Sequence, residues 1–266
     1  MELAGTHVVV TGGSQGIGLE TARLLVTKGA RVSLIARDAD RLAAAATGVG
    51  GDTQWRSADV TDPDAVTTAI DALVAERGDV DLLITSAGVA HPGYFEQLPL
   101  DVFHTQMDLI YFGTLHAIRA VVPAMIERGR GHVVTISSTA GLIGVFGYTA
   151  YAPAKYAVRG LAETLRSELA PRGIVVACAY PPDTRTPGFD AENELKPPET
   201  ERISAAIKPR EAEHVARAIV RGIEKDRLVI TADTQTAALA RAAGLLGPYV
   251  RWSMDRTVGK VRRERS

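Results

Sequence analysis

The stretch HVVVTGGSQGIGLETARLLVTKGARVSLIAR, residues 7–37, decides the fold of this chain. An apolar strand at 7–11 runs into a glycine-rich loop, and the loop opens an amphipathic helix that leads to a second apolar strand at 31–36. A strand, a helix and a second strand at this spacing predict the βαβ unit of a parallel sheet.

The glycines of this loop indicate what the unit binds. Gly12 and Gly13 can take positive φ at the turn, and Gly16 lets the backbone approach a ligand closely. Gly18 allows the helix to pack tightly on the strand. The first N–H groups of the helix and the positive end of its dipole then offer a site to a pyrophosphate. The spacing is not G-x-G-x-x-G, and such a loop taken alone is also compatible with a plain turn.

Strands and helices continue to alternate along the chain. The predicted strands are 7–11, 31–36, 53–59, 81–87, 131–137, 174–180 and 228–231. The predicted helices are 17–28, 38–46, 63–76, 99–127, 150–170 and 209–225. The pattern predicts one α/β domain over residues 1–266, a Rossmann-type doubly wound parallel sheet flanked by helices, with a C-terminal helical extension.

Composition narrows the class of protein. The 266 residues are 46% hydrophobic with a net charge of −1, which argues against a nucleic-acid binder. Cys178 is the single cysteine, so no disulfide is expected, and the histidines show no metal-ligand spacing. The chain enters its first strand directly after Met1-Glu2, and we identify no signal peptide and no apolar run of about 18 residues. We expect a cytoplasmic protein without a metal.

A second stretch, ISSTAGLIGVFGYTAYAPAKYAVRGLAE at 136–163, predicts the chemistry. Tyr151 and Lys155 lie four residues apart in an Ala-rich helical run, hence on one helix face. An ammonium beside a phenol is expected to lower the pKa of the phenol, which can then exchange a proton with a substrate. Ser138 ends the preceding strand and can hydrogen-bond the reacting oxygen, with Ser137 as the alternative.

Two segments depart from the alternation. Residues 181–208 are rich in Pro and Glu, and a loop this long is usually a lid or disordered. We expect a substrate lid with 187–205 mobile before substrate binds. Within 232–266, residues 241–266 carry seven basic and two acidic residues among apolar ones. This extension suits a helix on an anionic membrane surface, or one packed over the pocket or at a subunit contact; we expect 234–258 to be helical and beside the pocket.

Together these motifs resemble the short-chain dehydrogenase/reductase family. The resemblance covers nearly the whole chain and implies that Ser138, Tyr151 and Lys155 are catalytic. It also implies a dinucleotide bound by the glycine-rich loop, by Asp59 at the adenine, and by segments after the fourth and sixth strands. The implied cofactor contacts are Gly12, Ser14, Gly16, Ile17, Gly18, Arg37, Asp59, Val60, Ala87, Gly88, Tyr151, Lys155, Pro181, Thr184 and Thr186. Family members are often dimers or tetramers through helices like 99–127 and 150–170, so a homo-oligomer is expected.

The end of the second strand predicts which dinucleotide is used. Ala36 stands where NAD-preferring proteins carry an acidic residue, and Arg37 follows with a guanidinium that suits a 2′-phosphate. Asp38 is the competing carboxylate, but its position suits a helix cap. We expect NADP(H).

A narrower resemblance, carried above all by AYPPDTRTPGFDAENELKPPET at 179–200, is to 3-ketodihydrosphingosine reductases. It implies NADPH-dependent reduction of a long-chain keto lipid, a substrate that a C-terminal helix on a membrane surface would suit. Two positions depart from the family pattern: Ile110 stands where an Asn usually holds a proton-relay water, and Thr85 replaces the Asn after the fourth strand. Reduction of another apolar ketone, such as a 3-ketoacyl chain or a steroid, and a nucleotide-binding regulator with weak activity remain alternatives.

Overall fold

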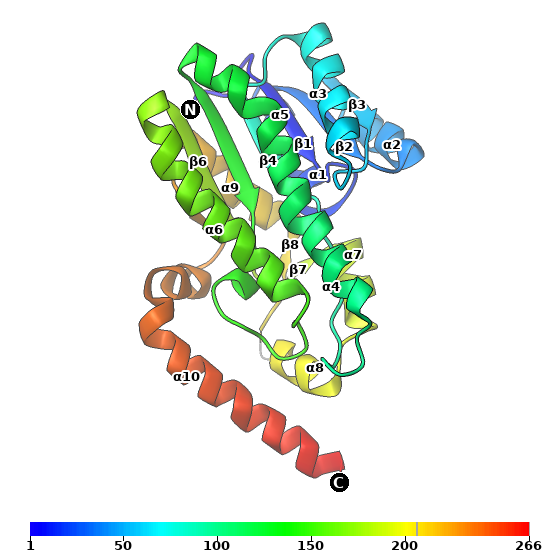
Figure 1. Ribbon diagram of the computed structural model, residues 1–266, viewed down its shortest axis with the longest axis vertical. Coiled ribbons are helices and arrows are strands. Elements are labelled where there is room, and N and C mark those ends of the chain that lie inside the picture. Colours follow the sequence, from blue (N-terminus) through cyan, green and yellow to red (C-terminus); the bar gives the residue numbers. More distant parts are fainter. Residues whose placement is uncertain (206, 266) are drawn as a thin grey trace.

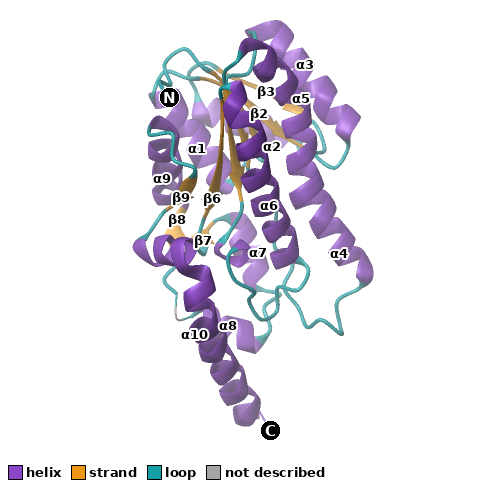
Figure 2. Cartoon of the chain, turned by 60° about the vertical axis from the view of Figure 1, so that its left-hand side comes forward, coloured by secondary structure: helices purple, strands orange, loops and turns teal. Residues whose placement is uncertain are grey.

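The computed structural model describes residues 1–205 and 207–265. Seven parallel strands form one sheet in the order β3-β2-β1-β4-β5-β6-β9, and Figure 2 shows this sheet between helices on both sides. The strand order reverses direction between β1 and β4, which is the switch point of a doubly wound sheet. The predicted fold class is therefore confirmed.

The element bounds follow the predicted alternation closely. The strands of the main sheet are β1 (His7–Thr11), β2 (Arg31–Ala36), β3 (Thr53–Ser57), β4 (Leu82–Thr85), β5 (Gly131–Ile136), β6 (Ile174–Tyr180) and β9 (Val229–Thr231). The helices are α1 (Gly16–Thr27), α2 (Ala39–Val49), α3 (Pro63–Arg77), α4 (Leu100–Met107), α5 (Gly113–Arg128), α6 (Tyr151–Leu169), α7 (Pro187–Asn193), α8 (Pro198–Ser204), α9 (Ala212–Glu224) and α10 (Thr234–Arg265). Short 3₁₀ turns lie at Thr139–Gly141 and Ala170–Arg172, and a small second sheet pairs β7 (Thr184–Arg185) with β8 (Arg210–Glu211).

Alternate residues of the central strands build two cores. Val8 and Val10 of β1 pack in one hydrophobic cluster with residues of α1, α2 and α9. Val9 packs in the other cluster with residues of α3, α5 and α6. Both sides of the sheet are thus covered, which explains why its strands read as continuous apolar runs.

The predicted helix 99–127 is confirmed as one helical run, Leu100–Arg128, but it is not α-helical throughout. A π-helical stretch, Asp108–Phe112, separates α4 from α5, and Ile110 within it is fully buried. A π-helical turn contains more residues than an α-helical turn. The spacing of apolar residues in the sequence does not reveal this local change.

The expectation that no segment is long and apolar enough to span a membrane is also corrected. Among the described residues, Leu100–Arg128 passes that test by length and composition, with a mean hydropathy of 1.5. Ala117, Val121 and Met125 of this segment are buried in the core on one side of the sheet, as expected for a core helix of a globular domain.

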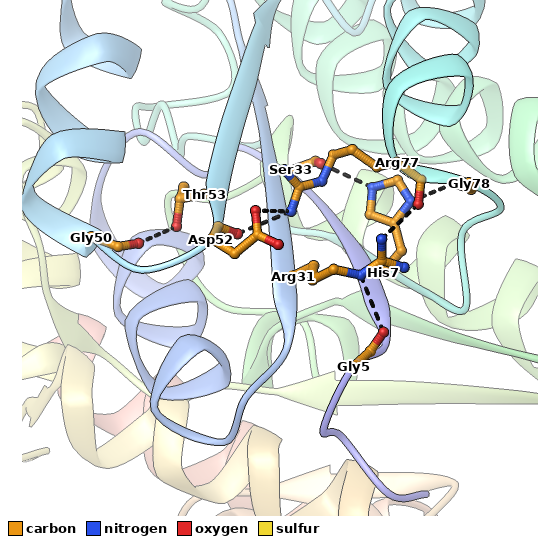
Figure 3. A network of polar contacts seen from close by, with 9 residues as sticks. All are labelled: Gly5, His7, Arg31, Ser33, Gly50, Asp52, Thr53, Arg77 and Gly78. Carbon is orange, nitrogen blue, oxygen red and sulfur yellow. Dashed lines mark hydrogen bonds and ion pairs between the residues drawn. The ribbon is translucent and has the colours of Figure 1, made fainter.

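A polar network holds the amino-terminal ends of β1 and β2, opposite the site described below (Figure 3). The buried His7 ring contacts the Gly78 carbonyl at 2.7 Å and the Ser33 hydroxyl at 2.9 Å. Arg77 reaches the Asp52 carboxylate at 2.7 Å. Burial is the main cause of a lowered pKa of His7, so this network uses a neutral imidazole.

The segment after β6 and the C-terminal helix lie together beyond the carboxyl end of the sheet (Figure 1). The segment 181–208 is ordered into β7, α7 and α8 over its described residues, whereas Ala206 lies outside them. α10 is helical as predicted, is kinked at Ala242 and packs against α8. Ser266 of the predicted extension lies outside the described residues.

Candidate active site

A cavity of about 1280 Å³ lies at the carboxyl ends of the strands. The loops after β1, β2, β4, β5 and β6 form one part of its wall, and segments of α7, α8 and α10 form the other. Figure 2 shows the strands running toward these helices. The loops at the strand ends and the helices beyond them therefore line one cavity.

The glycine-rich loop fits a dinucleotide phosphate. Gly12 has a φ of +69°, and a Cβ there would lie 2.6 Å from the Ala87 backbone nitrogen. A Cβ on Gly18 would lie 2.5 Å from the Gly12 carbonyl oxygen, so the helix packs on the turn as predicted. No side chain caps the start of α1, which leaves its first N–H groups directed at the cavity rim formed by Gly16 and Ile17. This backbone cradle fits the pyrophosphate of a bound dinucleotide.

The rim after β2 carries two guanidinium groups. Arg37 lines the cavity and lies 3.7 Å from the Asp59 carboxylate. Arg41, which the sequence analysis missed, also lines the cavity and donates to the Gln15 side chain at 3.1 Å. Asp38 accepts a hydrogen bond from the Arg41 backbone and caps α2, as predicted. Two cations and a capped carboxylate at this rim fit a 2′-phosphate.

Asp59, the expected adenine contact, is held by its own loop. Its carboxylate accepts two hydrogen bonds from Thr61, at 2.9 and 2.8 Å, and is not among the lining residues of the cavity. Its neighbour Val60 does line the cavity. The carboxylate of Asp59 positions the loop and Arg37, and the cavity surface at this point belongs to Val60.

Ser138 and Tyr151 meet at the centre of the cavity wall. Ser138 lies in the loop after β5, where its hydroxyl accepts from the Ala140 N–H at 3.1 Å. Tyr151 begins α6, and its hydroxyl hydrogen-bonds Ser138. Ser137 points elsewhere, since its hydroxyl donates to the Lys155 carbonyl oxygen at 2.9 Å. Of the two serines, Ser138 is the one beside Tyr151.

Lys155 lies one helical turn after Tyr151, as the spacing predicted. Its ammonium is 5.5 Å from the centre of the Tyr151 ring and donates to the Ile136 carbonyl oxygen at 2.9 Å. The side chain is 5% exposed, and burial lowers the pKa of Lys155 to about 8. Ile110 is fully buried in an apolar cluster with Ala154, the residue before Lys155 on α6. It offers no hydrogen bond at the position of the usual Asn.

The expected lowering of the pKa of Tyr151 is wrong for this structure. Burial raises the pKa of Tyr151, the charge of Glu192 raises it further, and the hydrogen bond from Ser138 acts in the opposite direction. The Lys155 ammonium points at the Ile136 carbonyl and has the ring of Tyr151 as its neighbour, so it does not offset these effects. The phenol is held in its protonated form.

The sequence analysis missed a second polar group of the cavity. Tyr148 lies with its ring centre 5.8 Å from that of Tyr151 and hydrogen-bonds the Glu192 carboxylate. Glu192 also lies 3.1 Å from the Lys196 ammonium, and Asp183 lines the cavity beside them. The charged residues of the lid segment were the available signal, but the contact between Tyr148 and Glu192 joins residues far apart in the chain.

The cavity brings together most of the predicted site residues. Lining it are Gly12, Ser14, Gly16, Ile17, Arg37, Val60, Ala87, Gly88, Ser138, Tyr151, Lys155, Pro181, Thr184 and Thr186. Gly18 and Asp59 are not among the lining residues. Apolar side chains of the lid segment and α10 complete the wall: Phe189, Ile203, Leu239, Leu246, Val250 and Met254.

Comparison with known proteins agrees with this geometry. Residues 6–196 match the family model described as short chain dehydrogenase. A 3-ketodihydrosphingosine reductase of Dictyostelium discoideum is 41% identical over 93% of this chain and 80% of its own length. A 3-dehydrosphinganine reductase of Danio rerio is 43% identical over 83% of this chain and 69% of its own length.

Among solved structures, levodione reductase superposes with a TM-score of 0.81 at 25% sequence identity, covering 88% of this chain and 99% of that one. The glycine-rich loop and the residues Ser138, Tyr151 and Lys155 lie within the range 6–196 that the family model matches. Of the strands of the main sheet, only β9 lies outside this range. The chain belongs to the short-chain dehydrogenase/reductase family of oxidoreductases.

Proposed function

We propose that the protein reduces the keto group of a long-chain 3-keto sphingoid base with NADPH. The observation that carries the proposal is that the hydrogen-bonded pair Tyr151 and Ser138 lines one large cavity. The glycine-rich phosphate cradle lines one part of this cavity, and apolar side chains line another. The names of the relatives support the substrate class. The Arg37 and Arg41 guanidinium groups support NADPH over NADH.

The roles of the side chains follow from their positions. Tyr151 donates a proton to the carbonyl oxygen, which its raised pKa suits because the phenol stays protonated until the oxygen gains charge. Ser138 holds the same oxygen by a hydrogen bond. Lys155 places a cation beside the Tyr151 ring, and burial lowers the pKa of Lys155 to about 8. The bound NADPH supplies the hydride.

The apolar part of the wall suits an alkyl chain. Leu246, Val250 and Met254 of α10 line the cavity together with Phe189 of α7. Each methylene moved from water to such a surface contributes about 0.8 kcal/mol. We propose that the segment 181–208 acts as a lid here, excluding water from the reaction.

The C-terminal helix supports a further part of the proposal, contact with an anionic membrane surface. Leu245, Tyr249 and Trp252 are strongly exposed on α10, at 83%, 68% and 55%. Residues 241–266 combine this apolar surface with seven basic and two acidic residues. A cytoplasmic, peripheral enzyme that draws its substrate from the membrane, and a homo-oligomer through α5 and α6, remain our predictions.

Substitution of Tyr151 tests the proposed chemistry. Tyr151→Phe should lower kcat for a long-chain 3-keto sphingoid base by about 10² to 10⁴ while the Kd for NADPH stays within a few-fold. The measurement combines steady-state turnover with cofactor titration, and Tyr156→Phe, a tyrosine on the exposed face of α6, is the matched control. Turnover close to that of the unaltered protein would remove Tyr151 from the reaction.

A further inference from the structure

The part of the cavity next to Tyr151 contains two carboxylates that the roles above do not use. Asp183 follows β6 and Glu192 lies on α7, and both line the cavity. Glu192 hydrogen-bonds Tyr148, whose ring centre lies 5.8 Å from that of Tyr151, and the charges of both carboxylates raise the pKa of Tyr151. An apolar ketone alone has no use for negative charge at this point.

Glu192 is already balanced by fixed partners. It accepts a hydrogen bond from the Tyr148 hydroxyl and lies 3.1 Å from the Lys196 ammonium. The Lys196 side chain is 1% exposed, donates to Asn193 at 2.7 Å and lies 4.3 Å above the centre of the Phe189 ring. The Lys196 ammonium is therefore paired with the Glu192 carboxylate.

Asp183 is less completely balanced, although the charge of Lys196 and a hydrogen bond with Ser204 favour its charged form. Its Oδ2 atom is buried and has no hydrogen-bond partner among the described residues. Burial is the main cause of its raised pKa, and the charge of Glu192 adds to it against that of Lys196. The ammonium of Lys155 is directed at the Ile136 carbonyl. Oδ2 of Asp183 is thus left without a partner in a residue that lines the cavity, and a buried carboxylate oxygen without a partner favours the binding of a cation.

The position of this unpaired oxygen limits what the cation can be. The carbonyl oxygen of a substrate must contact the Tyr151 hydroxyl, and the two carboxylates line the same cavity, with Glu192 joined to the neighbourhood of Tyr151 through Tyr148. The matching cation therefore lies within a bond or two of the carbonyl carbon. A protonated amine on the adjacent carbon of the ketone has that geometry.

We propose that Asp183, together with Glu192, binds an ammonium group on the carbon next to the substrate carbonyl, so that the site selects long-chain 2-amino ketones over neutral ketones of equal length. This inference rests on the proposed function, because it names the group beside the carbonyl that Tyr151 protonates. The carboxylates are specificity-determining residues, and the proton still comes from Tyr151.

The test compares three ketones of equal chain length: 3-ketodihydrosphingosine, its N-acetyl derivative, and the analogue with hydrogen in place of the amine. The unaltered protein should reduce the amino ketone with a kcat/KM at least about tenfold above that for both neutral ketones. Asp183→Asn should lower kcat/KM for the amino ketone by about tenfold or more and change the values for the neutral ketones by less than about threefold. Asp190→Asn, at an exposed carboxylate of α7, is the matched control and should change neither.

A binding measurement supports the interpretation of the rates. The product analogue sphinganine, a cationic amino alcohol, should compete with substrate more strongly than N-acetylsphinganine in the unaltered protein, and this difference should shrink in Asp183→Asn. Titration with NADPH shows that each variant is folded. If Asp183→Asn does not fold, Glu192→Gln and the ranking of the three ketones by the unaltered protein decide the question.

Two results would overturn the inference, and they separate it from the proposed function. Equal kcat/KM values for amino and neutral ketones, or an equal loss on all three in Asp183→Asn, would remove the ammonium site and leave the proposed reaction standing. Reduction of none of the three by protein that binds NADPH would overturn the proposed function, and the inference with it.

Discussion

Leu246 and Leu245 of α10 offer a test of where the alkyl chain of the substrate lies. Leu246 lines the cavity, whereas its neighbour Leu245 is 83% exposed and is not among the lining residues. Leu246→Ala removes the side-chain atoms beyond Cβ from the wall, and Leu245→Ala removes the same atoms from the outer surface of the helix. The two variants therefore change the protein by equal volume and polarity, and differ in whether the change reaches the cavity.

The magnitude follows from the apolar area that the chain covers. A half-buried leucine that contacts an alkyl chain contributes about 1–2 kcal/mol, which is about 5- to 30-fold in kcat/KM. We expect Leu246→Ala to lower kcat/KM by this factor for long-chain ketones and to leave short-chain ketones nearly unchanged, because a short chain does not reach α10. In the unaltered protein each further methylene should raise kcat/KM by up to about fourfold until the chain fills the cavity.

The assay is a homologous series of ketones measured on three proteins, in detergent-free solution below the aggregation limit of each ketone. Leu245→Ala should follow the unaltered protein along the whole series. A loss in Leu246→Ala that is equal at every chain length would refute the reasoning, because it would mean that α10 supports folding or assembly and does not contact the chain. Truncation after Ala242, where α10 is kinked, should enlarge the loss for long chains in the same direction.

Three further outcomes are expected. Ala36→Asp combined with Arg37→Ala should shift the ratio of the NADPH and NADH dissociation constants toward NADH by about tenfold, measured by titration; an unaltered protein that already prefers NADH would contradict this. Ile110→Asn should raise kcat while lowering the melting temperature, because an amide near Lys155 can hold a proton-relay water but is costly to bury; an unchanged kcat would mean that protons follow another route. Burial lowers the pKa of His132 to about 4 from its ordinary 6.5. As pH falls, the imidazole is therefore protonated in the unfolded chain before it is protonated in the folded protein. Up to about 3 kcal/mol of unfolding free energy should be lost between pH 6.5 and pH 4. Denaturation at several pH values measures this loss, and His132→Gln should flatten it.

The sheet and its cradle could be predicted from residues 7–37 because local rules govern them. A continuous apolar strand, a glycine-rich turn and an amphipathic helix can form only a few arrangements, and the right-handed crossover leaves one. Gly12 and Gly18 show why the turn needs glycine, since a Cβ at either would meet backbone atoms. The pair Tyr151 and Lys155 was predictable for the same reason, because four residues fix a shared helix face.

The helices of the lid segment were predictable from signals that the sequence analysis did not use. Thr186 caps α7 by accepting a hydrogen bond from Phe189, and Pro187 follows at the first helical position. Pro198 stands at the start of α8, where the residue before it is Pro197 and no side chain caps the helix. Proline at the first position, after a cap residue in the case of α7, is a signal for the start of a helix. Because this signal was not used, a long loop was expected where two short helices lie.

The electrostatics of the site could not be predicted from the sequence, since they depend on contacts between distant segments. The spacing of Tyr151 and Lys155 suggested a lowered pKa for the phenol, yet burial and Glu192 raise it. Glu192 reaches this position because α7 folds back toward the 3₁₀ turn and Tyr148 after β5. The π-helical stretch at Ile110 is similar, because its backbone departs from the α-helical period without a change in apolar pattern.

The two parts of the cavity wall therefore divide the work of the enzyme. The strand ends carry Tyr151, its partner Ser138 and the phosphate cradle, and these follow from short sequence patterns that serve any ketone. The segment between β6 and α9 carries Asp183 and Glu192, together with part of the apolar surface. The proposed selection of the substrate therefore depends on a segment that begins at the end of β6 and contacts α10 through α8. We expect that a change in this segment can alter which ketone is accepted without moving the hydroxyls of Tyr151 and Ser138, which bind and protonate the carbonyl oxygen.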